Sequence, residues 1–218
     1  MRTVRFYFDV ISPYVWLAWA QVPEVEARTG ARFDLQPVLF AGLLQANENK
    51  GPAEIPSKRV HMLHDIARWA MTLKRPYTGP PAHPFNPLKA QRMCAALDDP
   101  EARRSLAGAL IVATWEHGRD LMNDAELRAI ADDAGLDGSA LLAATEEKVV
   151  KERLRKNTEQ AIAEGVFGVP TFLVDDQLFW GNDRLGFLET YLTGGLRIDK
   201  AEIEERLARP RAADRKNV

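Results

Sequence analysis

Strand-like patterns occur only near the two ends of this 218-residue chain. At the front, residues 3–9 and 32–40 have β-rich character and flank an apolar, helix-compatible segment over 13–29, which Gly30 ends. Two strands joined by a helix in this way are expected to run parallel, with a right-handed crossover. These two strands are therefore one half of a sheet whose other half is expected from the far end of the chain.

That far end carries the complementary pieces. Residues 169–176 and 177–181 are predicted to be two strands joined by a tight turn, and a closing helix follows over 183–193. Together the two ends predict an α/β fold with a four-stranded mixed sheet, formed by residues 1–40 and 165–195.

The middle of the chain, residues 41–164, is predicted to be an insertion between the two halves of the sheet. It begins with a long loop over 41–56 that is rich in Gly, Asn and Pro. Helical patterns dominate after that, with Asp124 as an expected cap, over 57–74, 87–97, 101–117, 124–134 and 138–163. A charged tail, 196–218, ends the chain and can begin as a helix.

Composition excludes several classes of function. The chain is 46% hydrophobic and 28% charged with a net charge of −2, so no basic excess points to nucleic acid and none points to a membrane surface. No stretch approaches the roughly 18 apolar residues of a membrane span. The one cysteine, Cys94, lies in an apolar helical run and is expected to be a buried small hydrophobe. A reducing, cytoplasmic location is therefore predicted.

Five short motifs occur in order along the chain, and together they resemble one family. They read FDVISPYVWLA, NKGPAEIPSK, FNPLKAQR, GVFGVPTF and WGNDRL. In this order they resemble 2-hydroxychromene-2-carboxylate isomerases, which are relatives of kappa-class glutathione transferases. The resemblance covers about residues 3–194. It implies a thioredoxin-like fold with a large helical insertion, as in DsbA-like proteins.

Ser12 stands where the first strand gives way to the first helix. The simpler interpretation is an N-cap, with Pro13 at the first helical position. In thioredoxin-fold redox enzymes this helix start carries a Cys-x-x-Cys pair, but residues 12–15 read Ser-Pro-Tyr-Val. Dithiol redox chemistry is therefore excluded. The resemblance implies that Ser12 is the catalytic residue and donates to the thiolate of bound glutathione, with the positive helix end behind it.

Two motifs near the C-terminal end are implied to hold glutathione. In GVPTF the resemblance implies a cis peptide between Val169 and Pro170 that faces Ser12. Such a peptide leaves the Val169 backbone groups available to the cysteinyl part of glutathione. In GNDR, Asn182 or Asp183 can simply cap the last helix. The family pattern instead implies that Asp183 binds the ammonium of the γ-glutamyl group. Asn182 occupies a position that often carries a serine.

The middle motifs supply weaker candidates. Asn49 and Lys58 suit a solvated polar loop, but the family pattern points both into the active site as glutathione ligands. Asn86 before Pro87 is typical of a cap, and the resemblance also places it near the substrate pocket. Tyr77 can line that pocket as well, although core packing is the simpler interpretation, as it is for Trp180. His61 and His64 lack a matching third ligand, so no metal site is predicted.

The function implied by the resemblance is a glutathione-dependent isomerisation. It interconverts 2-hydroxychromene-2-carboxylate and trans-o-hydroxybenzylidenepyruvate in the catabolism of naphthalene-type aromatic compounds. The implied route is reversible thiolate addition, bond rotation and elimination, with glutathione as a cofactor and a small aromatic substrate. The family also implies a homodimer.

Two other functions remain open from the sequence. A kappa-class-like glutathione transferase or peroxidase acting on another electrophile shares nearly every implied glutathione contact. A thioredoxin-fold module that binds partners without catalysis is the third reading. The presence of Asn49, Lys58 and Asp183 argues against it, because a pure scaffold does not need them.

Overall fold

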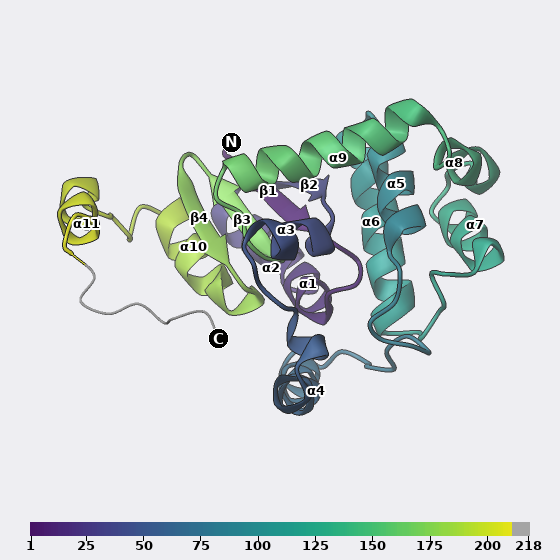
Figure 1. The fold of residues 1–218 in the computed structure, drawn as a ribbon, viewed down its shortest axis with the longest axis horizontal. Helices are drawn as coiled ribbons and strands as arrows, with labels where there is room; N and C mark the ends of the chain where they lie inside the picture. Colours follow the sequence, from purple (N-terminus) through teal and green to yellow (C-terminus); the bar gives the residue numbers. More distant parts are fainter. Residues whose placement is uncertain (211–218) are drawn as a thin grey trace.

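A four-stranded mixed sheet joins the two ends of the chain, as the sequence predicts (Figure 1). The structure is a computed structural model that describes residues 1–210. The strand order is β2-β1-β3-β4, with β1 parallel to β2 and antiparallel to β3, and with β4 antiparallel to β3. The strands are β1 (Thr3–Phe8), β2 (Arg32–Pro37), β3 (Thr171–Val174) and β4 (Gln177–Trp180).

Helices account for most of the remaining chain. The first two lie in the β-α-β unit, and the last ones follow the sheet: α1 (Pro13–Trp19), α2 (Val22–Thr29), the 3-10 turn η2 (Asn182–Arg184), α10 (Leu185–Leu192) and α11 (Lys200–Leu207). The insertion contains α3 (Phe40–Ala46), the 3-10 turn η1 (Pro52–Glu54), α4 (Pro56–Thr72), α5 (Leu88–Ala96), α6 (Pro100–Trp115), α7 (Asp124–Asp133), α8 (Gly138–Ala144) and α9 (Lys148–Ala163).

Several predicted boundaries are wrong, each for a local reason. The helix predicted over 13–29 is two helices, since Pro23 lacks an N–H and sits in the first turn of α2 rather than inside a longer helix. The segment 138–163 also divides, because the Thr145 hydroxyl donates to the Leu142 carbonyl and helps end α8. The predicted loop over 41–56 contains α3 and η1, and Asn123 rather than Asp124 caps α7.

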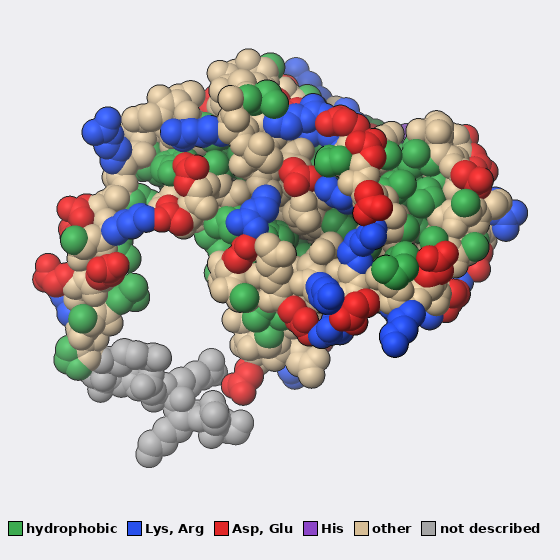
Figure 2. Space-filling view, turned by 90° about the horizontal axis from the view of Figure 1, so that it is seen from above, with side chains coloured by type: hydrophobic (Ala, Val, Ile, Leu, Met, Phe, Trp, Pro, Cys, Tyr) green, Lys and Arg blue, Asp and Glu red, His purple; other side chains and the backbone are tan. Residues whose placement is uncertain are grey.

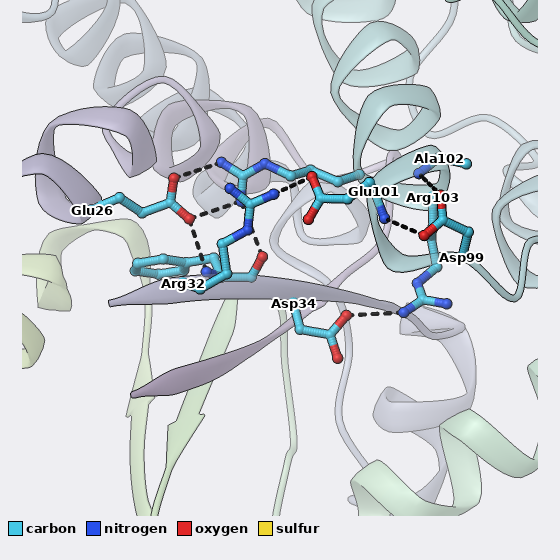
Figure 3. A network of polar contacts seen from close by, with 9 residues as sticks. Glu26, Arg32, Asp34, Asp99, Glu101, Ala102 and Arg103 are labelled. Carbon is cyan, nitrogen blue, oxygen red and sulfur yellow. Dashed lines mark hydrogen bonds and ion pairs between the residues drawn. The ribbon is translucent and has the colours of Figure 1, made fainter. Parts of the chain in front are cut away.

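A network of ion pairs fastens the outer edge of the sheet to the insertion (Figure 3). Arg103 of α6 pairs with Asp34 of β2 at 2.9 Å and also donates to the Leu35 carbonyl. Arg104 pairs with Glu26 of α2 at 2.8 Å, and both side chains are largely shielded from solvent. The Arg104–Glu26 pair is bidentate and therefore geometrically specific, so it fixes α6 against α2, while the single Arg103–Asp34 bond joins α6 to β2.

The apolar core runs without interruption from the sheet into the insertion. Phe6 and Phe172 pack at 4.8 Å between ring centroids on one side, and Met93 of α5 and Leu110 of α6 are fully buried in the same cluster. Cys94 is also fully buried, as predicted. The assignment of 1–40 plus 165–195, 41–164 and 196–218 as separate domains stays a prediction. Among residues 1–210, no helix combines the length and apolarity that a membrane crossing requires.

Candidate active site

Ser12 lies at the junction between β1 and α1 and is 7% exposed. Its backbone has the extended conformation of an N-cap and Pro13 occupies the first helical turn, as predicted, but its side chain does not cap the helix. Instead the Ser12 hydroxyl donates to the Val169 carbonyl at 3.4 Å. The side chain therefore points across to the far half of the sheet, so the simple capping interpretation is wrong for the hydroxyl.

The residue that Ser12 meets is part of the GVPTF segment. The Val169–Pro170 peptide bond is cis, as the resemblance implies. Val169 is 6% exposed, and none of the hydrogen bonds found within residues 1–210 uses its N–H. The Pro170 carbonyl accepts from the Gly181 N–H at 2.9 Å. The Val169 segment is thus tied to the turn that carries Asn182 and Asp183.

The Asn182–Arg184 turn differs from the predicted cap. Neither Asn182 nor Asp183 caps a helix with its side chain, because both belong to η2 itself. Asn182 is 4% exposed, and its Nδ2 has no hydrogen-bond partner among the described residues. Asp183 is exposed and pairs with Arg184 at 2.7 Å. A buried amide donor without a partner is costly, so a ligand that accepts from it would be stabilising.

Tyr14 connects this turn to the rest of the site. Its hydroxyl donates to Asp65 of α4 at 3.1 Å. Burial raises the pKa of Tyr14, and the carboxylates of Asp65 and Asp183 raise it further. Helix α1 also packs against η2, the turn that contains Asp183, and Ser12 contacts Val169 at the start of the same helix.

Asn49 lies on the exposed segment that leads into α4, and Lys58 lies in the first turn of α4. Both side chains are exposed, and Oδ1 of the Asn49 side chain accepts from the neighbouring Lys50 N–H at 2.8 Å. In residues 1–210, no hydrogen bond joins Asn49 or Lys58 to Ser12 or Val169. The structure places them on a neighbouring segment without bringing them into contact with the other predicted ligands.

The three remaining candidates divide between packing and exposure. Tyr77 is partly buried and stacks on Trp16 of α1 at 5.7 Å between ring centroids, which agrees with the packing interpretation. The Asn86 side chain accepts from the Leu88 N–H at 3.0 Å, but Pro87 rather than Asn86 occupies the N-cap position of α5. Core packing is wrong for Trp180, which is 51% exposed and stacks edgewise on Phe167.

Sequence reasoning missed two side chains of the insertion that donate hydrogen bonds to the backbone next to Ser12. We call this backbone, residues 8–12, the Ser12 junction. Gln91 of α5 is fully buried and donates to the carbonyls of Phe8 and Val38 at 2.9 and 2.8 Å. The Trp115 indole of α6 donates to the Val10 carbonyl at 2.9 Å. Because these partners lie 53 to 105 residues away in the chain, no local pattern could reveal them.

Two titratable groups flank Ile11, the residue before Ser12. The buried Asp9 carboxylate accepts from the Ile11 N–H at 3.1 Å and from the Phe40 N–H at 2.9 Å. On the other side, His83 donates through Nε2 to the Ile11 carbonyl at 3.1 Å. Burial raises the pKa of Asp9 to about 7 and lowers that of His83. The only sequence signal was that Asp9 interrupts an otherwise apolar run.

Within the described part of the chain, no three His, Cys, Asp or Glu side chains lie close enough together to hold a metal ion.

The comparisons with known proteins agree with this geometry. The model of the DSBA-like thioredoxin domain family matches residues 3–193. The chain is 38% identical to 2-hydroxychromene-2-carboxylate isomerase from Sphingobium xenophagum, over 88% of this chain and 98% of that relative. The chain belongs to this isomerase family, within the DsbA-like thioredoxin proteins.

More distant relatives are consistent with this membership. Human glutathione S-transferase kappa 1 is 28% identical over 86% of this chain and 89% of its own length. A solved structure of a 2-hydroxychromene-2-carboxylate isomerase superposes with a TM-score of 0.82, covering 95% of this chain and all of that one, at 23% identity. The predicted family and the predicted thioredoxin-like fold with a helical insertion are therefore confirmed.

Proposed function

We propose that this protein is a glutathione-dependent cis–trans isomerase that interconverts 2-hydroxychromene-2-carboxylate and trans-o-hydroxybenzylidenepyruvate. The proposal depends on one observation at Val169. The Ser12 hydroxyl lies 3.4 Å from the Val169 carbonyl oxygen, and the Val169 N–H has no hydrogen-bond partner among the described residues. A hydroxyl donor thus lies beside a backbone N–H that is free to bind a ligand, and residues 12–15 contain no cysteine. A thiol brought by a ligand suits that arrangement.

The residues present fit glutathione. The free Val169 N–H and the partly occupied Val169 carbonyl offer a peptide backbone the two bonds of a short antiparallel pairing. The unpartnered Nδ2 of buried Asn182 offers a donor to a carboxylate, and the exposed Asp183 carboxylate offers a partner to an ammonium group. The γ-glutamyl end of glutathione carries one carboxylate and one ammonium group, so each of these two groups has a protein partner of the right chemistry.

When bound, glutathione supplies a thiolate that can add reversibly to a carbon–carbon double bond conjugated with a carbonyl group. Ser12 is assigned the role of holding that sulfur by donating its hydroxyl proton, which stabilises the thiolate over the thiol. The start of α1 adds its positive end, and this effect is confined to the first turn. The break after Trp19 therefore does not weaken it.

The substrate side is assigned to the exposed polar segment and the loop before α5. Lys58 would bind a carboxylate of glutathione or of the keto acid, and Asn49 would bind polar groups of either ligand. Asn86 and Tyr77 lie on the loop that reaches the Ser12 junction through His83. These assignments follow the family pattern and the position of the two segments beside α1.

A homodimer, a cytoplasmic location and a role in the catabolism of naphthalene-type compounds complete the proposal. The isomerase relative supports the aromatic substrate, and the kappa-class relatives support glutathione. A kappa-class-like transferase acting on another electrophile is the second candidate, because it would use the same glutathione contacts.

The test is the ultraviolet absorbance of 2-hydroxychromene-2-carboxylate mixed with purified protein, with and without added glutathione. We expect rapid, glutathione-dependent conversion to the trans pyruvate. Conversion at the same rate without glutathione would contradict the cofactor assignment. Glutathione binding by calorimetry with no conversion would reject this substrate and favour the transferase.

A further inference from the structure

The C-terminal helix α11 lies beyond the residues that the family model matches. The family model ends at residue 193, and 98% of the isomerase relative is matched by only 88% of this chain. Helix α11 follows, with Asp199 capping it by accepting from the N–H groups of Ala201 and Glu202. It stands apart from the body of the molecule, with hydrophobic side chains on its surface (Figures 1 and 2).

An eight-residue helix is too short to be stable by itself in water. Every residue of α11 is exposed, and its polar tie to the body is the ion pair of Lys200 with Asp176 at the β3–β4 turn. Ile203 is 44% exposed and Leu207 is 79% exposed. Since these two lie four residues apart, they share one face of the helix. The stability of α11 therefore requires a surface that covers this face.

A matching surface exists on the same chain. A groove of about 440 Å³ lies between β4, η2 and α10, and its exposed floor includes Phe187, at 56% exposed, and Trp180, at 51%. The groove is lined by Phe167, Leu178, Phe179, Trp180, Arg184, Phe187, Leu196 and Ile198. We call these residues the C-terminal groove. Clustered exposed aromatic side chains are typical of a surface that another protein segment covers.

We propose that α11 of one copy docks into the C-terminal groove of a second copy, and that the exchange is reciprocal. Each chain carries one apolar helix face and one apolar groove, so a two-fold axis buries both pairs at once. Leu196 and Ile198 line the groove of their own chain. Because α11 begins two residues later, at Lys200, the helix starts beside the groove and would leave for the second copy from there.

Charge is compatible with the same occupant. Among the described residues that line the groove, Arg184 alone is charged, and it is already paired with Asp183 at 2.7 Å. Helix α11 and its cap carry four acidic residues, Asp199, Glu202, Glu204 and Glu205, against two basic ones, Lys200 and Arg206. No acidic residue within 1–210 lines the groove, so the net negative helix meets no like charge in its lining, and the apolar faces determine the match. The inference rests on the proposed homodimer but not on the proposed isomerase activity.

Cysteine pairing tests the exchange directly. The native Cys94 is fully buried, so an added thiol is the only accessible one in each variant. Full-length Phe187→Cys and Ile203→Cys proteins are mixed and mildly oxidised, then analysed by non-reducing electrophoresis and peptide mapping. We expect a covalent dimer with a 187–203 disulfide. Ser139→Cys, on an exposed position of α8, replaces Phe187→Cys as the control and should not cross-link.

Two other outcomes would overturn the proposal. A 187–203 disulfide that forms within one chain of the Phe187→Cys/Ile203→Cys double variant, with none in the mixture, would show that α11 covers its own groove. No 187–203 disulfide in either sample would show that α11 does not dock there.

Sedimentation separates this surface from the homodimer itself. The wild-type protein is expected at twice 24.4 kDa. Ile203→Asp should weaken the dimer at least tenfold, whereas Ala201→Asp, on the opposite face of α11, should leave it unchanged. A wild-type dimer that Ile203→Asp does not weaken overturns the exchange and leaves the homodimer standing. A wild-type monomer overturns both.

Discussion

The two parts of the candidate site are built in opposite ways. The Ser12 junction is buried, and side chains from α5, α6 and the loop before α5 bind its backbone groups. The segment with Asn49 and Lys58 is exposed, and its hydrogen bonds connect neighbours along the chain, as between Gly51 and Glu54. The Ser12 junction is therefore fixed by contacts from distant parts of the chain, whereas the segment with Asn49 and Lys58 is fixed mainly by local contacts.

The difference separates two tasks. A hydroxyl that stabilises a thiolate must be held within a fraction of an ångström, because misplacement costs catalysis steeply. A lysine that attracts a carboxylate acts over a longer distance and tolerates movement. We therefore expect substitutions in the buried part to change turnover or folding, and substitutions in the exposed part to change affinity modestly.

The largest effect is expected from Ser12→Ala. Removing the hydroxyl leaves the thiolate without its donor and should lower kcat by about 10²–10³-fold, as for other single donors of this kind. Steady-state kinetics at saturating glutathione measure the loss. Ser57→Ala, on an exposed position of α4, is the control and should keep wild-type kcat. Full turnover in Ser12→Ala would remove Ser12 from the catalytic assignment.

Gln91→Leu tests whether the insertion holds the junction. The change leaves the carbonyls of Phe8 and Val38 without their donor, at a cost of about 1–3 kcal/mol per buried group. Urea denaturation should show lower stability, and kcat should fall more than the affinity for glutathione. Gln45→Leu, at an exposed position of α3, is the matched control. Unchanged stability would mean that the amide contributes nothing to the junction.

Asp9→Asn tests the buried carboxyl through pH. Because burial raises the pKa of Asp9 from 3.8 to about 7, the folded state keeps a proton that the unfolded state releases between these values. Raising the pH across this window therefore weakens folding, by up to about 1.4 kcal/mol per pH unit. We expect the stability of Asp9→Asn to fall less steeply between pH 5 and 7, as measured by urea denaturation.

The control for this measurement is Asp133→Asn, whose carboxylate is 78% exposed. It should retain the pH slope of the wild-type protein. Parallel slopes for the wild-type and Asp9→Asn proteins would show that Asp9 is ionised throughout this range.

Asp183→Ala tests the γ-glutamyl contact. The side chain is half exposed and already paired with Arg184, so its loss should weaken glutathione binding by only about tenfold, near 1.4 kcal/mol. Calorimetry measures the dissociation constant, and kcat at saturating glutathione should stay close to wild type. A kcat effect equal to that of Ser12→Ala would contradict the separation of tasks.

The smallest effect is expected from Lys58→Ala. An exposed cation is screened by solvent, and its ion pair is worth about 0–1 kcal/mol, so KM should rise less than about fivefold. Raising the salt concentration should reduce the difference from wild type. Lys50→Ala, an exposed lysine on the same segment, serves as the comparison. A large loss of kcat in Lys58→Ala would show that Lys58 determines turnover, as proposed for Ser12, and not only affinity.

The sheet could be predicted because its evidence is local. Alternation in the strands and glycine at the turns depend on neighbours in sequence, and the family resemblance placed the two halves in one fold. The breaks at Pro23 and Thr145 were missed because apolar spacing continues across them. The short helix α3 was missed because Gly and Asn in the same segment suggested a loop.

The site divides in the same way. The resemblance pointed to Ser12 and Val169, and the structure brings them together. The resemblance also implied that the Val169–Pro170 peptide faces Ser12. It could not predict that the Ser12 hydroxyl donates to the Val169 carbonyl instead of capping its own helix, since that depends on the approach of two segments 157 residues apart. Gln91 and Trp115 show no motif at all, because their importance lies in which backbone groups the fold sets beside them.

The burial of Cys94 has a consequence for how the protein would respond to oxidants. The only thiol is inside the core, and burial raises its pKa to about 12, so it is held as the unreactive neutral form. Since the proposed chemistry depends on the thiol of glutathione, peroxide would stop the reaction by consuming glutathione and would leave Cys94 unmodified. Activity would then follow the supply of reduced glutathione and return as soon as that supply is restored.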